Sequence, residues 1–222
     1  MKTLTALVAL LLSLSSLSEI PAEISQAYED KDYKTVFLLL KDLAEQGDSD
    51  GQLLLFSSYF EGIGVNKNKD KSLEWLLKSA NQNNIYALDE LANYYELGID
   101  GVLLQDTQKA INTYKKLIKL NPKMSKYYEY SIALIYKYSI MDNTKAMHWY
   151  DKSAKKGHYL SQISLADLLL KQSKWKDDAN EYKQKAKVLI QKVFESKSSP
   201  KFIREHAEDL WDKYRLGDLL VE

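Results

Sequence analysis

The stretch "YFEGIGVNKNKDKSLEWLLKSANQN", Tyr59–Asn83, has the form of a turn between two helices. An aromatic pair comes first, Gly62 and Gly64 follow, and an apolar pattern resumes around Trp75. Glycine readily takes the backbone conformations that end helices and form tight turns. If this hairpin is one copy of a repeat, it decides the architecture of the whole chain.

The second half of the hairpin occurs four times along the chain. Each copy begins with an Asp or Asn, continues with apolar residues at three- and four-residue steps, and ends on a Gly or Asn. The first residues are Asp32, Asn68, Asp106 and Asp142, at spacings of 36, 38 and 36 residues, and the last are Gly47, Asn83, Asn121 and Gly157. An Asp or Asn can cap a helix start, the apolar steps make one buried stripe, and Gly or Asn permits a left-handed closing residue. The pattern therefore predicts a helix in each copy.

A second kind of helix is expected between these copies. Its pattern is a small residue, an apolar residue four positions later, and a large one four positions beyond that. The first positions are Gly51, Ala87, Tyr128 and Ser161, with Tyr128 a large residue in the small slot. A small side chain there lets the paired helix approach closely. The glycines after Tyr59 and Tyr95 supply a turn, which Val65 or Val102 would plug.

The combined pattern "G-x-x-x-L-x-x-x-Y-x-x-G-x-G-V-x-x-N-x-x-K-S-x-x-W-x-x-K-S-A" resembles a Sel1-like repeat (SLR), the longer-turn relative of the tetratricopeptide repeat. The resemblance covers roughly residues 27–172. The tetratricopeptide itself is the alternative, but its unit has about 34 residues, and the Gly-x-Gly-Val turn favours the Sel1-like type. Stacked helix pairs bury a continuous core, which implies an all-α, right-handed superhelical solenoid of antiparallel helix pairs with a concave face. We expect about four repeats in residues 19–172, and capping helices in residues 173–222 at Lys183–Val193 and Phe202–Tyr214.

The first eighteen residues have the form of a signal peptide. Lys2 gives a positive start, Thr3–Leu17 carries no charge, and small residues precede a cleavage position after Ser18. A buried core helix and an uncleaved anchor are the alternatives. We expect an exported bacterial protein, periplasmic or secreted, with no integral membrane segment after cleavage. The chain has no cysteine, so it forms no disulfide and has no thiolate chemistry.

The sequence offers little for catalysis. The three histidines are His148, His158 and His206, and no metal-ligand spacing accompanies them; a surface histidine on a repeat is the simpler interpretation. Gly62-x-Gly64 belongs to a repeat turn, and Asp177-Asp178 reads as helix-start charge rather than as a metal pair. We therefore expect no enzyme activity, no cofactor and no metal.

A partner-binding surface is the remaining candidate. Tyr94, Tyr127 and Tyr130 do not fall at repeat-defining positions. The resemblance implies groove-facing positions two, six and nine residues after the small residue of the first helix. These positions are Asp89, Asn93 and Glu96, then Tyr130, Leu134 and Lys137, then Ile163, Asp167 and Leu170, with Tyr127 beside them. The predicted partner-binding residues are Asp89, Asn93, Glu96, Tyr127, Tyr130, Lys137 and Asp167.

Charge is unevenly distributed between the two halves of the chain. Residues 19–110 hold 17 acidic and eight basic residues, a net charge of −9, whereas residues 111–222 have a net charge of +8. The expected partner is a protein or peptide in the concave groove; the oligomeric state stays open, and two arginines favour no nucleic acid. The resemblance implies a non-catalytic, exported interaction scaffold. The alternatives are a cell-wall glycan binder or enzyme, and a structural subunit of an envelope complex.

Overall fold

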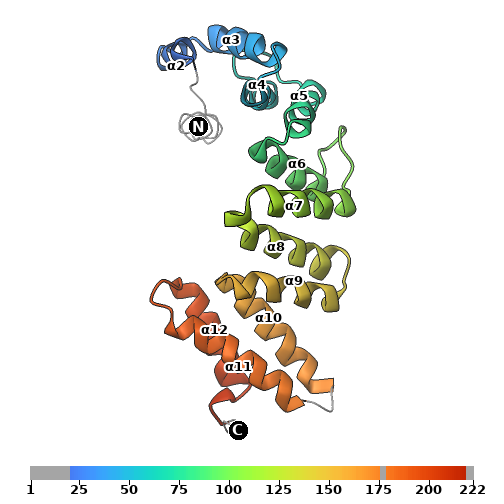
Figure 1. Ribbon diagram of the computed structural model, residues 1–222, viewed down its shortest axis with the longest axis vertical. Coiled ribbons are helices and arrows are strands. Elements are labelled where there is room, and N and C mark those ends of the chain that lie inside the picture. The colour runs from blue at the N-terminus through green and yellow to red at the C-terminus, as the bar shows by residue number, and fades with distance from the viewer. Residues whose placement is uncertain (1–20, 176–178, 219–222) are drawn as a thin grey trace. The chain divides into compact units, whose positions relative to one another are not determined.

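The computed structural model describes residues 21–175 and 179–218, so the expected signal peptide and the Asp177-Asp178 pair lie outside the described residues. In the described part, regular structure is helical apart from one isolated bridge between Ile99 and Leu103. The chain divides into two compact units, with the boundary between Thr113 and Tyr114, inside one helix (Figure 1). The predicted all-α fold is confirmed, and each unit is described by itself below.

The first unit is a run of consecutive helices. They are α2 (Ala22–Glu29), α3 (Tyr33–Glu45), α4 (Ser49–Glu61), α5 (Lys69–Asn81), α6 (Ile85–Leu97) and the start of α7 (Thr107–Leu120). Helix α4 packs against both α3 and α5, and α6 packs against α5. The helix α2, which precedes the repeats, buries Ile24 and Ala27 against Val36, Leu40 and Leu54.

The second unit continues the alternation from the remainder of α7. It contains α8 (Ser125–Leu134), which runs into a π-helical turn (Ile135–Ser139), then α9 (Asn143–Lys155), α10 (Tyr159–Gln172), α11 (Ala179–Glu195) and α12 (Lys201–Lys213). Short 3₁₀ turns lie at Pro122–Met124, Ser173–Trp175 and Leu216–Asp218. The two helices expected after residue 172 are present as α11 and α12, and both pack on α10.

Side-chain caps begin the four helices of the repeated pattern, as predicted. The carboxylate or amide oxygens of Asp32, Asn68, Asp106 and Asp142 accept hydrogen bonds from the backbone N–H groups three residues later, at 3.1, 2.9, 2.8 and 2.9 Å. Each bond satisfies one of the free N–H groups of the first helical turn. These four residues therefore fix where α3, α5, α7 and α9 start.

The predicted left-handed closing residues are confirmed in three copies. Gly47, Asn83 and Gly157 have φ angles of +94°, +65° and +77°. Asn121 has a φ of −131°, so the prediction for this copy is wrong. Pro122 follows it, and the proline ring pushes the preceding residue toward extended backbone.

Close helix approach depends on the small slot of the first helix. A Cβ on Gly51 would lie 2.9 Å from the Cβ of Leu43, so only glycine fits this spacing between α3 and α4. Tyr128 occupies the same slot in α8 and stacks on Tyr114, with ring centroids 6.2 Å apart. Stacked aromatic rings therefore separate α7 and α8 at this place, where a small residue would let the two backbones meet.

The turn after the first helix takes two forms. In the first unit, the carbonyl of Tyr59 accepts from the N–H of Asn68 at 2.9 Å, across a turn that contains Gly62 and Gly64. In the second unit, the carbonyl of Tyr136 accepts from the N–H of Asp142 at 2.8 Å, across a shorter turn. The π-helical turn Ile135–Ser139 makes the shorter connection possible while the aromatic residue keeps its place.

Helices α11 and α12 share one core with α9 and α10. Ala186, Ile190 and Ile203 from these two helices pack with residues of α10 that include Ile163 and Leu170. Ile163 is 2% exposed and Leu170 is fully buried. The expectation that these two residues face an open groove is therefore wrong, because α11 and α12 pack over that part of α10.

Candidate binding surface

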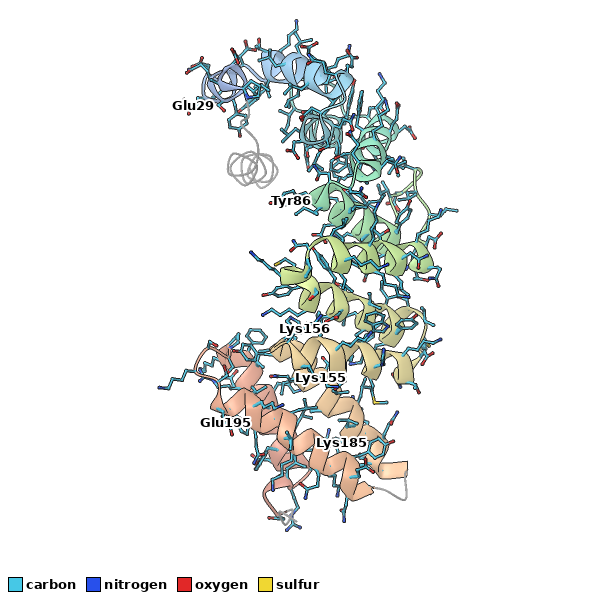
Figure 2. All side chains as sticks on the ribbon, viewed as in Figure 1. Glu29, Tyr86, Lys155, Lys156, Lys185 and Glu195 are labelled. Carbon is cyan, nitrogen blue, oxygen red and sulfur yellow. The ribbon has the colours of Figure 1, made fainter. Side chains whose placement is uncertain are left out.

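The predicted partner-binding residues occupy three helices. Asp89, Asn93 and Glu96 lie on α6 in the first unit, whereas the others lie on α8, its π-helical turn and α10 in the second. Asn93 is exposed, and Asp89 and Glu96 are partly buried. Figure 2 shows the side chains of both units on the ribbon. The two groups belong to different units.

Helix α6 carries two adjacent carboxyl groups, Asp89 and Glu90, whose charged forms are disfavoured by their surroundings. Burial raises the pKa of the Asp89 carboxyl. Burial and the neighbouring charge of Asp89 raise the pKa of Glu90. In the described part of the chain, no lysine or arginine forms an ion pair with either carboxylate. Two adjacent acidic groups without a cation favour a basic group from a partner.

Aromatic rings lie near one of these carboxylates, that of Glu90. Phe56 and Phe60 of α4 contact Tyr94 of α6, with ring centroids 6.0 and 5.8 Å from that of Tyr94. Burial first, and then the charges of Glu90 and Glu61, raise the pKa of the Tyr94 hydroxyl. Carboxylates next to ring faces form a surface that suits a cationic side chain.

In the second unit, two predicted tyrosines meet a histidine. The ring centroids of Tyr127 and Tyr130 lie 5.3 and 4.7 Å from that of His158, both in edge-on geometry. Tyr127 is 43% exposed, and the ammonium of Lys126 lies 5.2 Å from its ring centroid. The structure therefore brings Tyr127 and Tyr130 together in one half-exposed aromatic cluster, defined here as Tyr127, Tyr130 and His158.

A chain of hydrogen bonds holds the cluster in place. The hydroxyl of Ser153 donates to the carbonyl of Lys126 at 2.6 Å, and that of Ser161 donates to Ser153 at 2.7 Å. The Nδ1 of His158 lies 2.8 Å from the Ser161 oxygen. Because each hydroxyl has one proton to give, His158 is the donor at the end of this chain. The chain links α8, α9 and α10 and fixes the imidazole orientation.

The Ser161–His158 contact has the separation of a nucleophile and its base. Ser161 is fully buried, however, so no substrate atom reaches its hydroxyl. His158 is itself only 8% exposed, and burial, followed by the charge of Lys126, lowers its pKa to about 4. The expectation of a surface histidine is therefore wrong for His158, which is a neutral structural group at pH 7. His148 and His206 are exposed, as expected.

The remaining predicted residues of the second unit gather around Tyr150. Tyr130 lies 5.8 Å from the fully buried ring of Tyr150, and the ammonium of Lys137 lies 6.0 Å from it. The charge of Asp167 is close enough to contribute to the raised pKa of the Tyr150 hydroxyl, for which burial is the largest cause. Asp167 pairs with Lys171 at 2.7 Å. Leu134 is partly buried and packs on the same core.

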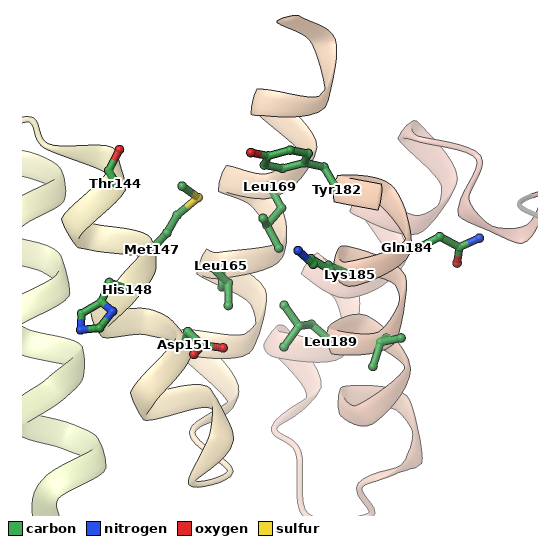
Figure 3. Close-up of a pocket in the computed structure, with 11 residues that line it drawn as sticks. Thr144, Met147, His148, Asp151, Leu165, Leu169, Tyr182, Gln184, Lys185 and Leu189 are labelled. Atoms are coloured by element: carbon green, nitrogen blue, oxygen red, sulfur yellow. The ribbon is translucent and has the colours of Figure 1, made fainter. Parts of the chain in front are cut away.

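An apolar hollow of about 720 Å³ lies elsewhere in the second unit, between α9, α10 and α11 (Figure 3). Its apolar lining is Met147, Leu165, Leu169, Tyr182, Val188 and Leu189, and its polar residues are Thr144, His148, Asp151, Gln184 and Lys185. None of the predicted partner-binding residues lines it.

Sequence reasoning missed the hollow and the buried, structural role of His158, and a signal for each is present in the chain. The residue after the left-handed position is Asp48 in one copy and Asn84 in another, and both cap the next helix. His158 stands in that place without capping α10. The hollow follows from the lack of a Gly-x-Gly-Val turn after Leu169.

In residues 21–175 and 179–218, no three His, Asp or Glu side chains come together in a way that could hold a metal ion. Across the same residues, no helix combines the length and the apolar character needed to cross a membrane.

The repeats of this chain match a known protein family. Residues 49–84, 85–122 and 123–158 each match the Sel1 repeat family model. A putative sel1-like repeat-containing protein L18 of Acanthamoeba polyphaga mimivirus is 45% identical over 49 residues, which make up 22% of this chain and only 8% of the viral protein.

A solved structure supports the fold. The Sel1 repeat protein from Oxalobacter formigenes has 22% identity and a TM-score of 0.51, over 83% of this chain and 80% of that one. The chain is also similar to c5321, a protective antigen of uropathogenic Escherichia coli strains with an SLR fold, at 22% identity and a TM-score of 0.49, over 86% of this chain and 52% of that one. This chain is a Sel1-like repeat protein of the tetratricopeptide-like helical-repeat class.

Proposed function

We propose that this protein is an exported, non-catalytic scaffold that binds a protein or peptide, with one candidate surface on α6 of the first unit and another at the aromatic cluster of the second unit. Sel1 repeats commonly mediate interactions between proteins, and no membrane-spanning helix occurs in the described part of this chain. The acidic group of α6 and the aromatic cluster of α8 and α10 supply the side chains for binding.

The aromatic cluster is the observation that carries the proposal. A tyrosine that is 43% exposed, held by a ring contact to a buried histidine, is a rigid side chain that loses little freedom when it binds. Exposed tyrosines of this kind are typical anchors of protein interfaces. The hydrogen-bond chain from His158 to Lys126 gives the cluster a structural support that an incidental surface ring does not need.

A cross-linked pull-down from intact bacterial cells tests the proposal. The full chain, carrying an affinity tag at its C-terminus, is expressed, cross-linked and purified, and co-purified proteins are identified by mass spectrometry. We expect one or a few envelope proteins, which are lost in the double variant Asn93→Ala, Tyr127→Ala. Both side chains are exposed, so this variant should fold normally.

Phe202→Ala is the matched control. Phe202 is an aromatic residue on α12 with 62% exposure, so its removal takes away similar surface from another helix. Retention of the partners by the control and their loss in the double variant would establish the scaffold and locate its surface. Equal recovery from all three proteins would overturn the proposed surface.

A cell-wall glycan is the second candidate, because sugars stack on aromatic rings and Tyr127 is 43% exposed. Recovery of glycan fragments instead of proteins, with the same loss on Tyr127→Ala, would favour this candidate. Export has its own test. If cleavage follows Ser18, the intact mass of the protein recovered from the cell envelope fraction corresponds to a chain that begins at Glu19.

A further inference from the structure

The hollow of the second unit occupies a place that the first unit fills with its own chain. In the first unit, Phe37 of α3 and Leu55 and Tyr59 of α4 form a small apolar cluster. Counting from the caps Asp32 and Asp142, Phe37 corresponds to Met147, since each lies five residues after its cap. Counting from the small residues Gly51 and Ser161, Leu55 and Tyr59 correspond to Leu165 and Leu169. These three counterparts all line the hollow (Figure 3).

A turn fills the space in the first unit. Val65, which follows the glycine turn, packs against the cluster together with Trp75 of α5. The turn comes so close to α3 that a Cβ on Gly64 would overlap the carbonyl oxygen of Tyr33 and lie 2.8 Å from the Cβ of Phe37. Ile63, the neighbouring residue of the same turn, is 7% exposed. An aliphatic side chain on a glycine turn is therefore the natural occupant of this space.

The second unit has neither the Gly-x-Gly-Val turn nor aromatic residues at the positions of Phe37 and Tyr59. After Leu169, helix α10 continues to Gln172 and into the 3₁₀ turn Ser173–Trp175, with no Gly-x-Gly-Val sequence. Met147 and Leu169 are smaller than the Phe37 and Tyr59 to which they correspond. The space between α9, α10 and α11 is thus left as a hollow of about 720 Å³.

We propose that this hollow is a docking site for a short turn of another protein that carries a valine or isoleucine side chain. The apolar floor of Leu165, Leu169 and Leu189 would receive that side chain, as the corresponding floor receives Val65. Thr144, His148 and Asp151 on one side and Lys185 on the other offer polar groups to the backbone of the incoming turn. The site is separate from the aromatic cluster, so it does not depend on the function proposed above.

The first turn of this chain provides the probe. A fluorescent peptide with the sequence of residues 59–68, YFEGIGVNKN, is titrated with the purified full chain, and binding is followed by anisotropy. We expect saturable binding, and none for the same peptide with aspartate in place of the isoleucine and the valine.

Two protein variants place the binding in the hollow. Val188→Glu sets a charge at the hollow from a residue that is 49% exposed, so it should not disturb the fold. Leu169→Tyr fills the hollow with the ring that Tyr59 supplies in the first unit, and it should raise the midpoint of thermal unfolding. We expect each variant to weaken peptide binding by about tenfold or more.

Leu160→Glu is the control, because Leu160 is 37% exposed on α10 and does not line the hollow. It should bind the peptide as the unaltered chain does. Absence of binding, or binding that survives both Val188→Glu and Leu169→Tyr, would overturn the proposal. The second result would indicate that the peptide displaces the turn of the first unit instead.

Discussion

The two units build the same helix pair and finish it differently. Asn68 in the first unit and Asp142 in the second cap their helices at the same distance of 2.9 Å. The first unit then closes its helix pair with a glycine turn that carries an aliphatic plug, whereas the second uses a π-helical turn after α8 and leaves a hollow beside α10. The difference shows that caps and apolar stripes are enough to specify the repeat. The turns vary between the units, and the hollow beside α10 arises from that variation.

The largest change in stability is expected from a substitution in the glycine turn of the first unit. In Gly64→Ala, the new Cβ would overlap the Tyr33 carbonyl at a φ of +69°, so α3 and the turn must separate. We expect a loss of about 3 to 5 kcal/mol in the free energy of unfolding, the range of strongly disruptive substitutions. Urea unfolding followed by tryptophan fluorescence, to which Trp75 beside this turn contributes, measures it.

Gly101→Ala separates the two causes of that loss. Gly101 has a similar φ of +77°, but a Cβ there would meet nothing within 4 Å. Only the backbone penalty applies, which amounts to about 1 to 2 kcal/mol. Equal losses in the two variants would mean that contact with α3 does not hold the turn in place.

The next largest change in stability comes from His158 in the second unit, and it depends on pH. The pKa of His158 is lowered to about 4 in the folded protein, below the ordinary value of 6.5. As pH falls from 6.5 toward 4, the unfolded chain takes up a proton at this residue and the folded chain does not, so stability is lost in that window. The expected loss between pH 7.5 and pH 5 is about 2 kcal/mol. No loss from this residue is expected above pH 7.5.

His158→Asn isolates that contribution. Asparagine is the residue at the corresponding place in the first unit, where Asn84 caps α6. Urea unfolding of the two proteins at pH 7.5 and pH 5 gives the pH-dependent part as the difference between them, in which the other titrating groups cancel. A constant difference at both pH values would contradict the low pKa.

The comparison also explains what the sequence could predict. The four caps, three of the four left-handed closing residues and the alternation of helices follow from local chemistry, and the structure has them all. The groove positions rested on spacing within one repeat. Spacing cannot show that α11 and α12 bury Ile163 and Leu170, because that burial depends on helices without the repeat pattern. In the same way, the role of His158 depends on Ser153 and Ser161, which meet only after α9 and α10 have packed.

The smallest change in stability is expected at Asp89 in the first unit, and its dependence on pH is opposite to that of His158. Burial raises the pKa of Asp89, so near pH 4 the folded chain binds more protons at this residue than the unfolded chain does. Stability contributed by this group therefore rises as pH falls through the raised pKa, whereas that of His158 falls. Asp89→Asn removes the penalty of a buried charge and should raise the free energy of unfolding at pH 7 by about 0.5 kcal/mol.

The gain from Asp89→Asn should shrink at pH 4, which urea unfolding at the two pH values measures. A gain that does not change with pH would mean that the pKa of Asp89 is the same in the folded and unfolded chains, and that the gain does not come from the buried charge. If the gain shrinks as expected, the carboxylate is kept on α6 against its own stability. Burial is the cause of that cost, and it makes the Asp89 carboxylate the group on α6 whose stability responds to acid in the direction opposite to His158.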